Sequence, residues 1–212
     1  MTNKGFKNLI SISKTSNQHK LRKIAKDTLR IGELSGAVEL PEGENINEWL
    51  AVNAIEFYNE ISLLFGCLTE FCTSEVCPTM CAGPKFEYLW TDPNYSTKPM
   101  KVPAKDYINY LMTWVENQIN NPKIFPTETE SQFSSNFIDV IKLIFKRLFR
   151  VYAHIYYCHF YHLQLLEADP HLNTSFKHFV FFIDKFELVS KKDLMPLNDL
   201  ITEFKNRKII IK

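Results

Sequence analysis

Apolar residues recur at helical spacing along most of the chain. Trp49, Ile61 and Phe65 lie on one wide face of a segment that ends near Phe65, and apolar positions three and four residues apart are typical of an amphipathic helix. Asn45 or Asn47 is the expected N-cap, because its side-chain oxygen can accept a hydrogen bond from the first turn. The same reasoning predicts further helices at 20–31, 104–120, 134–168, 173–188 and 194–206.

The segment 134–168 is the longest and most apolar of these, so we expect it to be the central core helix. Turns that contain Pro122, Pro170 and Pro196 separate the later helices. The stretch 85–102 alternates apolar and polar residues on both sides of a turn, which predicts a small β-hairpin. Strand patterns are otherwise nearly absent, so the sequence predicts an all-α domain with a loop-and-hairpin insert.

Charge is distributed unevenly, although the 212 residues carry a net charge of only +1. Residues 1–30 hold eight Lys and Arg against one Asp, whereas residues 31–84 hold nine Glu and no Lys, Arg or Asp. Residues 85–212 carry a net +3. Either the solvated helix faces are merely segregated by charge, or the acidic segment binds a basic partner and the basic half binds an anion. Nucleic acid is not expected to bind the folded part, because the acidic segment would repel phosphate.

Several protein classes are excluded by what the sequence lacks. It has no stretch of about 18 apolar residues and no signal peptide, so neither a membrane span nor secretion is expected. In a reducing compartment the five cysteines are free thiols or metal ligands rather than disulfides. The sequence contains no glycine-rich phosphate loop, G-x-S-x-G or H-E-x-x-H motif, and we therefore do not expect an enzyme.

Cysteine and histidine residues form a candidate metal site. Cys72 and Cys77 are separated by four residues, within the range of zinc-binding pairs. Two thiolates and two imidazoles would saturate a zinc ion and make the site structural. The helical candidates are His154, Cys158, His159 and His162. Cys158 shares a helical face with His154, whereas His159 is rotated by about 140° in an ideal helix, so spacing leaves the second helical ligand open. The alternative is that all of these are core residues.

A basic cluster precedes these histidines. Lys146, Arg147 and Arg150 lie three or four residues apart and can converge on one patch, with Lys142 one turn earlier. Guanidinium groups suit a phosphate because they donate paired hydrogen bonds to it. The alternative is that these residues form the solvated side of an amphipathic helix.

An acidic stripe is predicted on the helix that ends near Phe65. Glu48, Val52, Glu56 and Glu60 recur every four residues, which places them along one exposed face. Their negative charge would attract a basic partner.

Motifs along the chain resemble the Mob/phocein family of kinase coactivators. In chain order they are Leu40-Pro-Glu-Gly-Glu44, Asn47-Glu-Trp-Leu-Ala-Val-Asn53, Thr69-Glu-Phe-Cys-Thr73, Cys77-Pro-Thr-Met-Cys-Ala-Gly-Pro84, Tyr110-Leu-Met-Thr-Trp-Val115, Lys146-Arg-Leu-Phe-Arg-Val-Tyr-Ala-His-Ile-Tyr156 and His171-Leu-Asn-Thr-Ser-Phe-Lys-His-Phe179. They run from about residue 28 to the C-terminus in family order. The chain is most similar to the branch that activates NDR/LATS kinases.

The resemblance implies an all-α fold built on a four-helix-bundle core, with additional helices, a small β-hairpin and a structural zinc site. It selects Cys72, Cys77, His154 and His159 as the ligands of Zn2+ and gives no role to Cys81 and Cys158. Residues 28–212 would form the Mob-type domain. Residues 1–27 would form a flexible basic arm with the start of the first helix.

The resemblance also implies two binding surfaces. The N-terminal regulatory region of an NDR/LATS-type kinase would bind Glu44, Glu48, Trp49, Val52, Glu56 and His178. For Trp49 a core position is the alternative. A phosphorylated Hippo/MST-type kinase would bind a pocket formed by Lys146, Arg147 and Arg150. Thr15 and Thr28 match threonines whose phosphorylation in relatives loosens an inhibitory arm.

We therefore predict a non-catalytic adaptor that docks an activated Hippo-type kinase and promotes the activation of an NDR/LATS-type kinase. The alternative is a Mob-family scaffold in a phosphatase–kinase assembly that does not activate these kinases, and a zinc enzyme is a third interpretation. We expect a protein that is monomeric when free and cytoplasmic, with the nucleus and the spindle poles or centrosomes as further locations.

Overall fold

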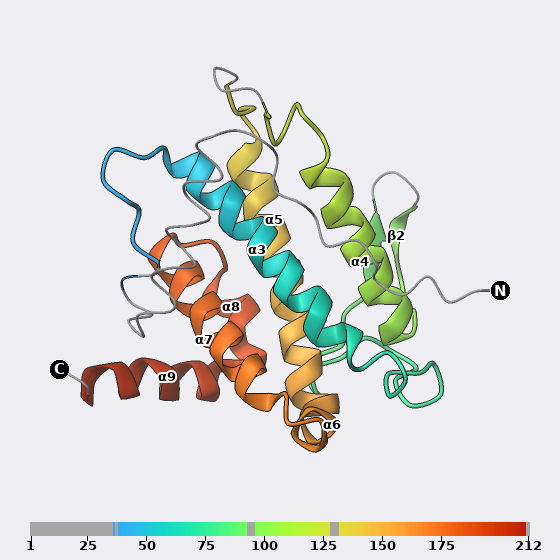
Figure 1. The fold of residues 1–212 in the computed structure, drawn as a ribbon. Coiled ribbons are helices and arrows are strands. Elements are labelled where there is room, and N and C mark those ends of the chain that lie inside the picture. The colour runs from blue at the N-terminus through green and yellow to red at the C-terminus, as the bar shows by residue number, and fades with distance from the viewer. Residues whose placement is uncertain (1–35, 37, 93–95, 128–131, 211–212) are drawn as a thin grey trace.

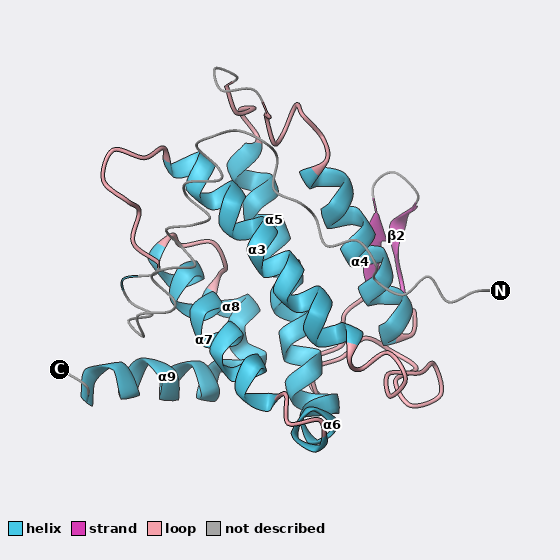
Figure 2. Ribbon diagram, in the orientation of Figure 1, coloured by secondary structure: helices cyan, strands magenta, loops and turns pink. Residues whose placement is uncertain are grey.

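The computed structural model describes residues 36, 38–92, 96–127 and 132–210 (Figure 1). Helices dominate these residues, as Figure 2 shows. The elements in chain order are α3 (Ile46–Gly66), β1 (Trp90–Asp92), β2 (Ser96–Met100), α4 (Ala104–Ile119), α5 (Phe137–His154), the π-helix η1 (Ile155–His159), α6 (Phe160–Leu165), α7 (Asp169–Lys185), α8 (Lys191–Leu194), the 3-10 helix η2 (Met195–Leu197) and α9 (Asn198–Ile210). The predicted all-α class with a small hairpin is confirmed.

The core is centred on α3, which contacts α4, α5 and α7, while α4 also packs on α5. Figure 1 shows α3 running between α4 on one side and α7 on the other. The ring of Phe57 on α3 lies 5.7 Å from that of Phe145, 5.2 Å from Phe179 and 5.5 Å from Phe182, measured between centroids. None of these four rings is exposed, and burying each stabilises the fold by about 1.5–3 kcal/mol. The helices α3 and α5 thus share the central position predicted for one helix.

Local capping explains where two helices begin. Asn45, rather than Asn47, is the N-cap of α3, because its side chain accepts a 2.8 Å hydrogen bond from the Asn47 backbone N–H. The helix α7 begins at Asp169, earlier than predicted. Pro170 lies in its first turn, where the missing N–H costs no helical hydrogen bond. A proline expected to separate two helices therefore opens the second one.

The helix predicted at 134–168 is divided into three elements. After α5, five residues form the π-helix, and α6 then ends at Leu165. It ends there because Glu167 adopts a left-handed φ of 55°. The N–H groups of Glu167 and Ala168 donate to the carbonyls of Gln164 (3.0 Å) and Leu163 (2.9 Å). These two hydrogen bonds form a Schellman motif, a common helix C-cap.

The final helix predicted at 194–206 is also divided. The side chain of Ser190 caps the short α8 by accepting a hydrogen bond from Asp193 N–H. Pro196 lies in the 3-10 turn that follows, and α9 starts only at Asn198. Because proline cannot donate a helical hydrogen bond, the tight turn separates the two helices.

The hairpin packs against the helical core. Its strands pair antiparallel, with Trp90 opposite Met100 and Asp92 opposite Ser96. The buried Trp90 ring lies edge-on to Tyr107 of α4, with 5.4 Å between centroids. This contact places β1 beside α4 and close to the basic cluster of α5.

Some predictions concern residues outside the described part of the chain. They are the helix at 20–31, the arm at 1–27 and the threonines Thr15 and Thr28. The domain boundaries at 28–212 stay a prediction. Among the described residues, no helix is both long and apolar enough to cross a membrane.

Candidate functional site

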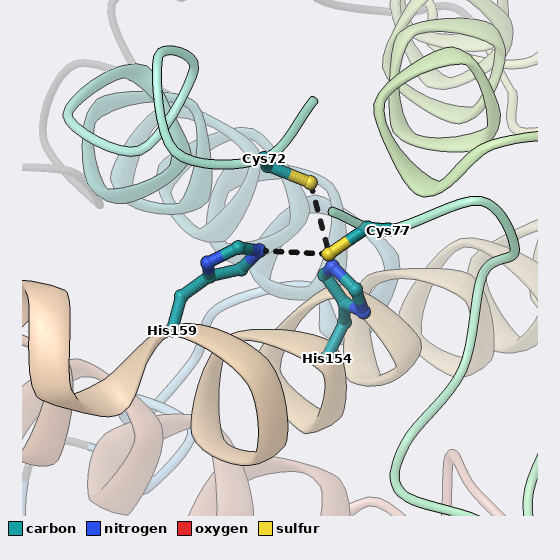
Figure 3. A group of neighbouring side chains, drawn as sticks. All are labelled: Cys72, Cys77, His154 and His159. Carbon is teal, nitrogen blue, oxygen red and sulfur yellow. Dashed lines mark hydrogen bonds between the residues drawn. The ribbon is translucent and has the colours of Figure 1, made fainter. Parts of the chain in front are cut away.

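Four buried side chains from distant parts of the chain form one cluster. Cys72 and Cys77 belong to the loop after α3, whereas His154 ends α5 and His159 ends the π-helix. Figure 3 shows both imidazoles projecting from the same helical segment toward the two sulfur atoms. All four donor atoms lie within 4.8 Å of one another, and no member is more than 6% exposed. The structure therefore brings the four predicted ligands together in a cluster that could hold a metal ion.

The distances within this cluster fit a tetrahedral ion. Cys72 Sγ lies 3.5 Å from His154 Nε2, and Cys77 Sγ lies 3.4 Å from His159 Nε2. Bonds of about 2.3 Å to sulfur and about 2.0–2.1 Å to nitrogen, as in zinc proteins, separate two tetrahedral ligands by about 3.5 Å. Both the donor types and their spacing therefore fit a metal with four protein ligands.

The π-helix decides which helical residues meet. In an α-helix, residues five apart such as His154 and His159 would be rotated by about 140°. The segment Ile155–His159 instead forms a π turn, in which hydrogen bonds link residues five apart. The two imidazole centroids are consequently only 5.1 Å apart. His154 Nδ1–H donates a 2.8 Å hydrogen bond to the carbonyl of Cys81, which orients its Nε2 toward the cluster.

Burial favours the uncharged form of all four groups. It raises the pKa of the Cys72 thiol, an effect increased by Cys77, and it raises the pKa of Cys77 as well. Burial lowers the pKa of His154, and it lowers the pKa of His159 to about 4 with help from the neighbouring histidines. A divalent cation would displace the thiol protons, and its charge would offset the cost of burying thiolates.

Two other candidates from the sequence lie outside the cluster. The His162 ring packs 4.5 Å from Phe71 and 5.5 Å from His159, measured between centroids. Cys158 instead groups with Cys81 and His154, again with donor atoms within 4.8 Å of one another. Helical spacing left Cys158 and His159 as alternatives, and the π turn brings His159 into the cluster.

The basic cluster lies upstream of these histidines on α5. Lys146 Nζ pairs with Asp193 Oδ1 at 2.9 Å. Arg150 Nη1 donates a 2.6 Å hydrogen bond to the hydroxyl of Tyr107, and its guanidinium lies 5.0 Å from the centre of the Tyr88 ring. Both basic side chains remain half-buried. Each of these two side chains thus has a polar partner within the protein and remains accessible to solvent.

Arg147 lies deeper than its two neighbours and is only 6% exposed. Its guanidinium stacks 4.7 Å from the ring centre of Trp90 and 4.2 Å from that of Trp114. Nη2 donates a 3.0 Å hydrogen bond to the carbonyl of Thr91, whereas Nη1 is buried without a hydrogen-bond partner among the described residues. Burial lowers the pKa of the Arg147 guanidinium, and the positive charge of Arg150 also acts to lower it. The interpretation of this helix side as merely solvated is therefore wrong for Arg147.

The predicted acidic stripe on α3 is only partly exposed. Val52 is fully buried, so the expectation that it lies on an exposed face is wrong. Trp49 is buried as well, which confirms the core alternative for this residue. Glu48 and Glu56 are half-buried. Spacing failed here because α3 packs against three other helices rather than one.

A groove between α3 and α7 was not predicted. It encloses about 440 Å³. The lining includes Leu63, Leu64, Cys67, Ala168, His171 and His178. His178 is a buried member of this lining, and neither ring nitrogen has a hydrogen-bond partner among the described residues. Burial lowers the pKa of this histidine to about 4. The sequence signal for the groove is the apolar Leu63, three residues after Glu60 of the predicted acidic stripe. In the structure its side chain is 60% exposed.

Comparison with known proteins identifies the family. Residues 26–197 match the Mob1/phocein family. The chain is 53% identical over 199 residues to MOB kinase activator-like 1 homolog B of Dictyostelium discoideum, a match that covers 94% of this chain and 92% of that protein. It is 54% identical over 181 residues to MOB kinase activator-like 1B of Arabidopsis thaliana, covering 85% of this chain and 84% of the relative. This extent of similarity confirms the resemblance seen in the motifs, and the chain belongs to the Mob1/phocein family.

Proposed function

We propose that this protein is a non-catalytic coactivator that binds the N-terminal regulatory region of an NDR/LATS-type kinase. Similar proteins carry the name kinase activator, which supports a kinase as the partner. The observation that carries the proposal is the groove between α3 and α7, which has apolar walls beside an acidic helix. Such a surface is suited to a partner helix with one apolar and one basic face.

Charge complementarity points to a basic occupant. Glu60 lines the groove, and its Oε2 accepts a 2.5 Å hydrogen bond from Ser175 Oγ on α7, which fixes the carboxylate beside the apolar wall. The negative charge continues along α3 with Glu56 and Glu48 and extends to Glu44, just before the helix begins. Trp49 and Val52 are buried on the core side of this helix, and His178 is a buried residue of the groove lining.

Activation would follow from binding alone. A regulatory segment that becomes helical in the groove would be stabilised in one of its conformations, and the kinase population would shift toward the state that presents this conformation. No chemical step on the coactivator is required.

Calorimetric titration with the regulatory segment of an NDR/LATS-type kinase tests the proposal. Leu63→Asp places a charge on the exposed groove wall and should weaken binding by about tenfold or more, equivalent to at least about 1.4 kcal/mol. Leu165→Asp is the matched control, because Leu165 is equally exposed but lies on α6 and does not line the groove. Equal affinity of these two variants would contradict the groove assignment.

The acidic residues are tested separately. Glu48→Lys combined with Glu56→Lys should abolish measurable binding at about 0.15 M salt, where long-range attraction is screened. Glu87→Lys combined with Asp139→Lys changes the net charge equally at two exposed acidic residues outside the groove and should leave affinity within about twofold. Purification of the protein with phosphatase subunits but without such a kinase would favour the scaffold alternative.

We further propose that Lys146, Arg147 and Arg150 bind a phosphorylated segment of a Hippo/MST-type kinase. The supporting observation is Arg147 Nη1, a buried guanidinium donor without a hydrogen-bond partner among the described residues. A phosphate oxygen would satisfy this donor, and Lys146 could exchange its contact with Asp193 for the more highly charged phosphate.

Titration with a phosphothreonine peptide and its unphosphorylated form tests this pocket. Lys146→Ala combined with Arg150→Ala should reduce affinity for the phosphorylated peptide by about tenfold or more. Lys142→Ala is the control, since Lys142 is exposed one turn earlier on the same helix. If the wild-type protein binds both peptides equally, the pocket does not recognise phosphate.

We propose that the ion held by Cys72, Cys77, His154 and His159 is Zn2+ and that its role is structural. Two thiolates and two imidazoles are a common ligand set of structural zinc sites, and four protein ligands leave no coordination position for a substrate. Metal analysis should find one zinc per chain, and the cobalt-substituted protein should show the absorption spectrum of a tetrahedral S2N2 site. A spectrum that changes on addition of anions would instead indicate an open position and favour a zinc enzyme.

A further inference from the structure

Two cysteines lie beside the cluster of Cys72, Cys77, His154 and His159, called the metal cluster below, but are not members of it. Cys81 lies in the loop before the hairpin and Cys158 in the π-helix, and both are half-buried free thiols. Together with His154 they form a second group whose donor atoms lie within 4.8 Å of one another. The two sulfur atoms are therefore neighbours, although the residues are far apart in the sequence.

Backbone contacts hold the loop that carries Cys81 in place. The carbonyl of Cys81 accepts the 2.8 Å hydrogen bond from His154 Nδ1, which ties the loop to the end of α5. Cys81 also forms an isolated β-bridge with Glu87, and Ala82 N–H donates a 2.8 Å hydrogen bond to the carbonyl of Phe86. The position of Cys81 next to the helix is thus a property of the loop backbone and does not depend on its thiol.

The same loop packs directly on the residue before Cys158. Gly83 has a φ of +72°, and a Cβ atom at this position would lie only 2.8 Å from the ring of Tyr157. A side chain here would clash with the tyrosine, so glycine allows the close approach. The hydroxyl of Tyr157 donates a 3.1 Å hydrogen bond to the carbonyl of Pro196, which fixes the ring. The loop and the π-helix are therefore held together next to both thiols.

We propose that Cys81 and Cys158 are a modification site at which a peroxide forms an intramolecular disulfide. Side-chain rotations can bring sulfur atoms within 4.8 Å to the S–S distance of about 2.05 Å when the backbones are already adjacent. With hydrogen peroxide, one thiol sulfur attacks an oxygen and breaks the O–O bond to become a sulfenic acid, and the thiol proton leaves with the departing hydroxide as the first water. The other thiol then attacks this sulfur, and its proton leaves with the hydroxyl group as the second water.

Burial distinguishes this pair from the other three cysteines. Cys72 and Cys77 are buried within the metal cluster, where a bound cation would shield their sulfur atoms from oxidants. Cys67 is exposed at the end of α3, but it lies in neither of the two Cys/His groups. Cys81 and Cys158 alone combine partial exposure with a neighbouring thiol. Reversible disulfides of this kind occur in reducing compartments as redox sensors.

Peptide mapping by mass spectrometry tests the proposal on the metal-loaded full-length chain treated with hydrogen peroxide. We expect a cross-linked peptide pair containing Cys81 and Cys158 that is two hydrogen atoms lighter than the reduced peptides. Free thiols, counted after unfolding and metal removal, should fall from five to three per chain. Metal content should stay unchanged, and a dithiol reductant should restore all five thiols.

Serine variants provide the controls. Cys81→Ser and Cys158→Ser should each abolish the cross-link, whereas Cys67→Ser, which removes an exposed thiol outside both Cys/His groups, should form it as the wild type does. A disulfide between Cys72 and Cys77 with release of metal, or a cross-link only between chains, would overturn the proposal. The wild-type peptide map decides the question even if a serine variant folds poorly.

Discussion

The helix α5 and the π-helix that follows it carry the basic cluster and both histidines of the metal cluster. The environments of these two groups are opposite in character. In the basic cluster, Lys146 and Arg150 keep a polar partner and some contact with solvent, and Arg147 stacks between two tryptophan rings. In the metal cluster, His154 and His159 are buried, and burial lowers the pKa of each. The first cluster compensates its charge with local partners, whereas the second is suited to a cation bound among neutral groups.

The backbone differs between the two clusters as well. The basic residues lie on regular α-helix, so spacing correctly places them next to one another. The second imidazole ends a π turn, and the regular spacing fails there. Periodicity is thus a reliable guide to a cluster only while the hydrogen-bond pattern that it assumes continues.

Loss of a member of the Cys72, Cys77, His154 and His159 cluster should have the largest effect. Cys72→Ser is expected to lower the free energy of unfolding by about 4 kcal/mol. This is less than the ~10–16 kcal/mol that zinc binding contributes to the folding of zinc-finger peptides, because the aromatic core of this protein remains without the metal. For a chain of this size that corresponds to a melting temperature lower by about 10 °C. A strong chelator should lower the melting temperature of the wild type toward the same value, as measured by thermal denaturation.

The control for this prediction is Cys67→Ser, which changes an exposed cysteine outside the cluster. It should melt within about 2 °C of the wild type and respond to the chelator in the same way. Identical melting of the wild type with and without chelator would show that the cluster does not depend on a cation.

His178 is a third buried histidine, and it lies outside the metal cluster. Burial lowers the pKa of His178 from 6.5 to about 4 in the folded protein. Protons therefore bind the unfolded chain more tightly, so stability is full above about pH 6.5 and is lost as the pH falls toward 4. At about 1.4 kcal/mol per pH unit, His178 should account for a loss of about 3 kcal/mol across this window.

His178→Phe keeps an aromatic ring next to Phe57, whose centroid lies 4.8 Å away. Chemical denaturation between pH 7 and pH 4 should show a shallower loss of stability for this variant than for the wild type. The difference between the two curves isolates His178 from the other histidines. Parallel curves would mean that folding does not change the pKa of His178, contrary to the prediction.

Substitutions within the basic cluster should have the smallest effects on stability, and these effects should differ between its residues. Arg147→Ala removes two stacking contacts and the hydrogen bond to Thr91, and it should cost about 2 kcal/mol. Lys146→Ala removes an ion pair between partly exposed groups and should cost less than about 1 kcal/mol. Urea denaturation measures both, and equal costs would contradict the expectation that Arg147 contributes more to stability than Lys146.

Most helices of the described part could be predicted because their apolar spacing is regular. The segment predicted at 104–120 is found as α4 at Ala104–Ile119, and the helix ending near Phe65 is found as α3. The errors occur where one residue changes the local geometry. The left-handed Glu167 ends α6, Pro170 opens α7 rather than preceding it, and the turn with Pro196 delays α9.

The candidate site was predictable in its chemistry but less so in its arrangement. Residue types and motif resemblance named the four members of the metal cluster, and the structure brings them together. The burial of Val52 and the groove beside Leu63 were missed, because they depend on which other helices cover α3. Packing between helices involves residues far apart in the chain, and the period of a single helix does not contain it.

The all-α class, the family motifs and the supply of thiols, imidazoles and guanidinium groups follow from the sequence alone. How each of these groups is used depends on the three-dimensional fold. Cys81 and Cys158 became neighbours because a loop packs on a π turn, and Arg147 became buried because the hairpin supplies Trp90 and α4 supplies Trp114. Contacts of this kind depend on the relative placement of whole elements, whereas composition and periodicity report only on residues that are near one another in the chain.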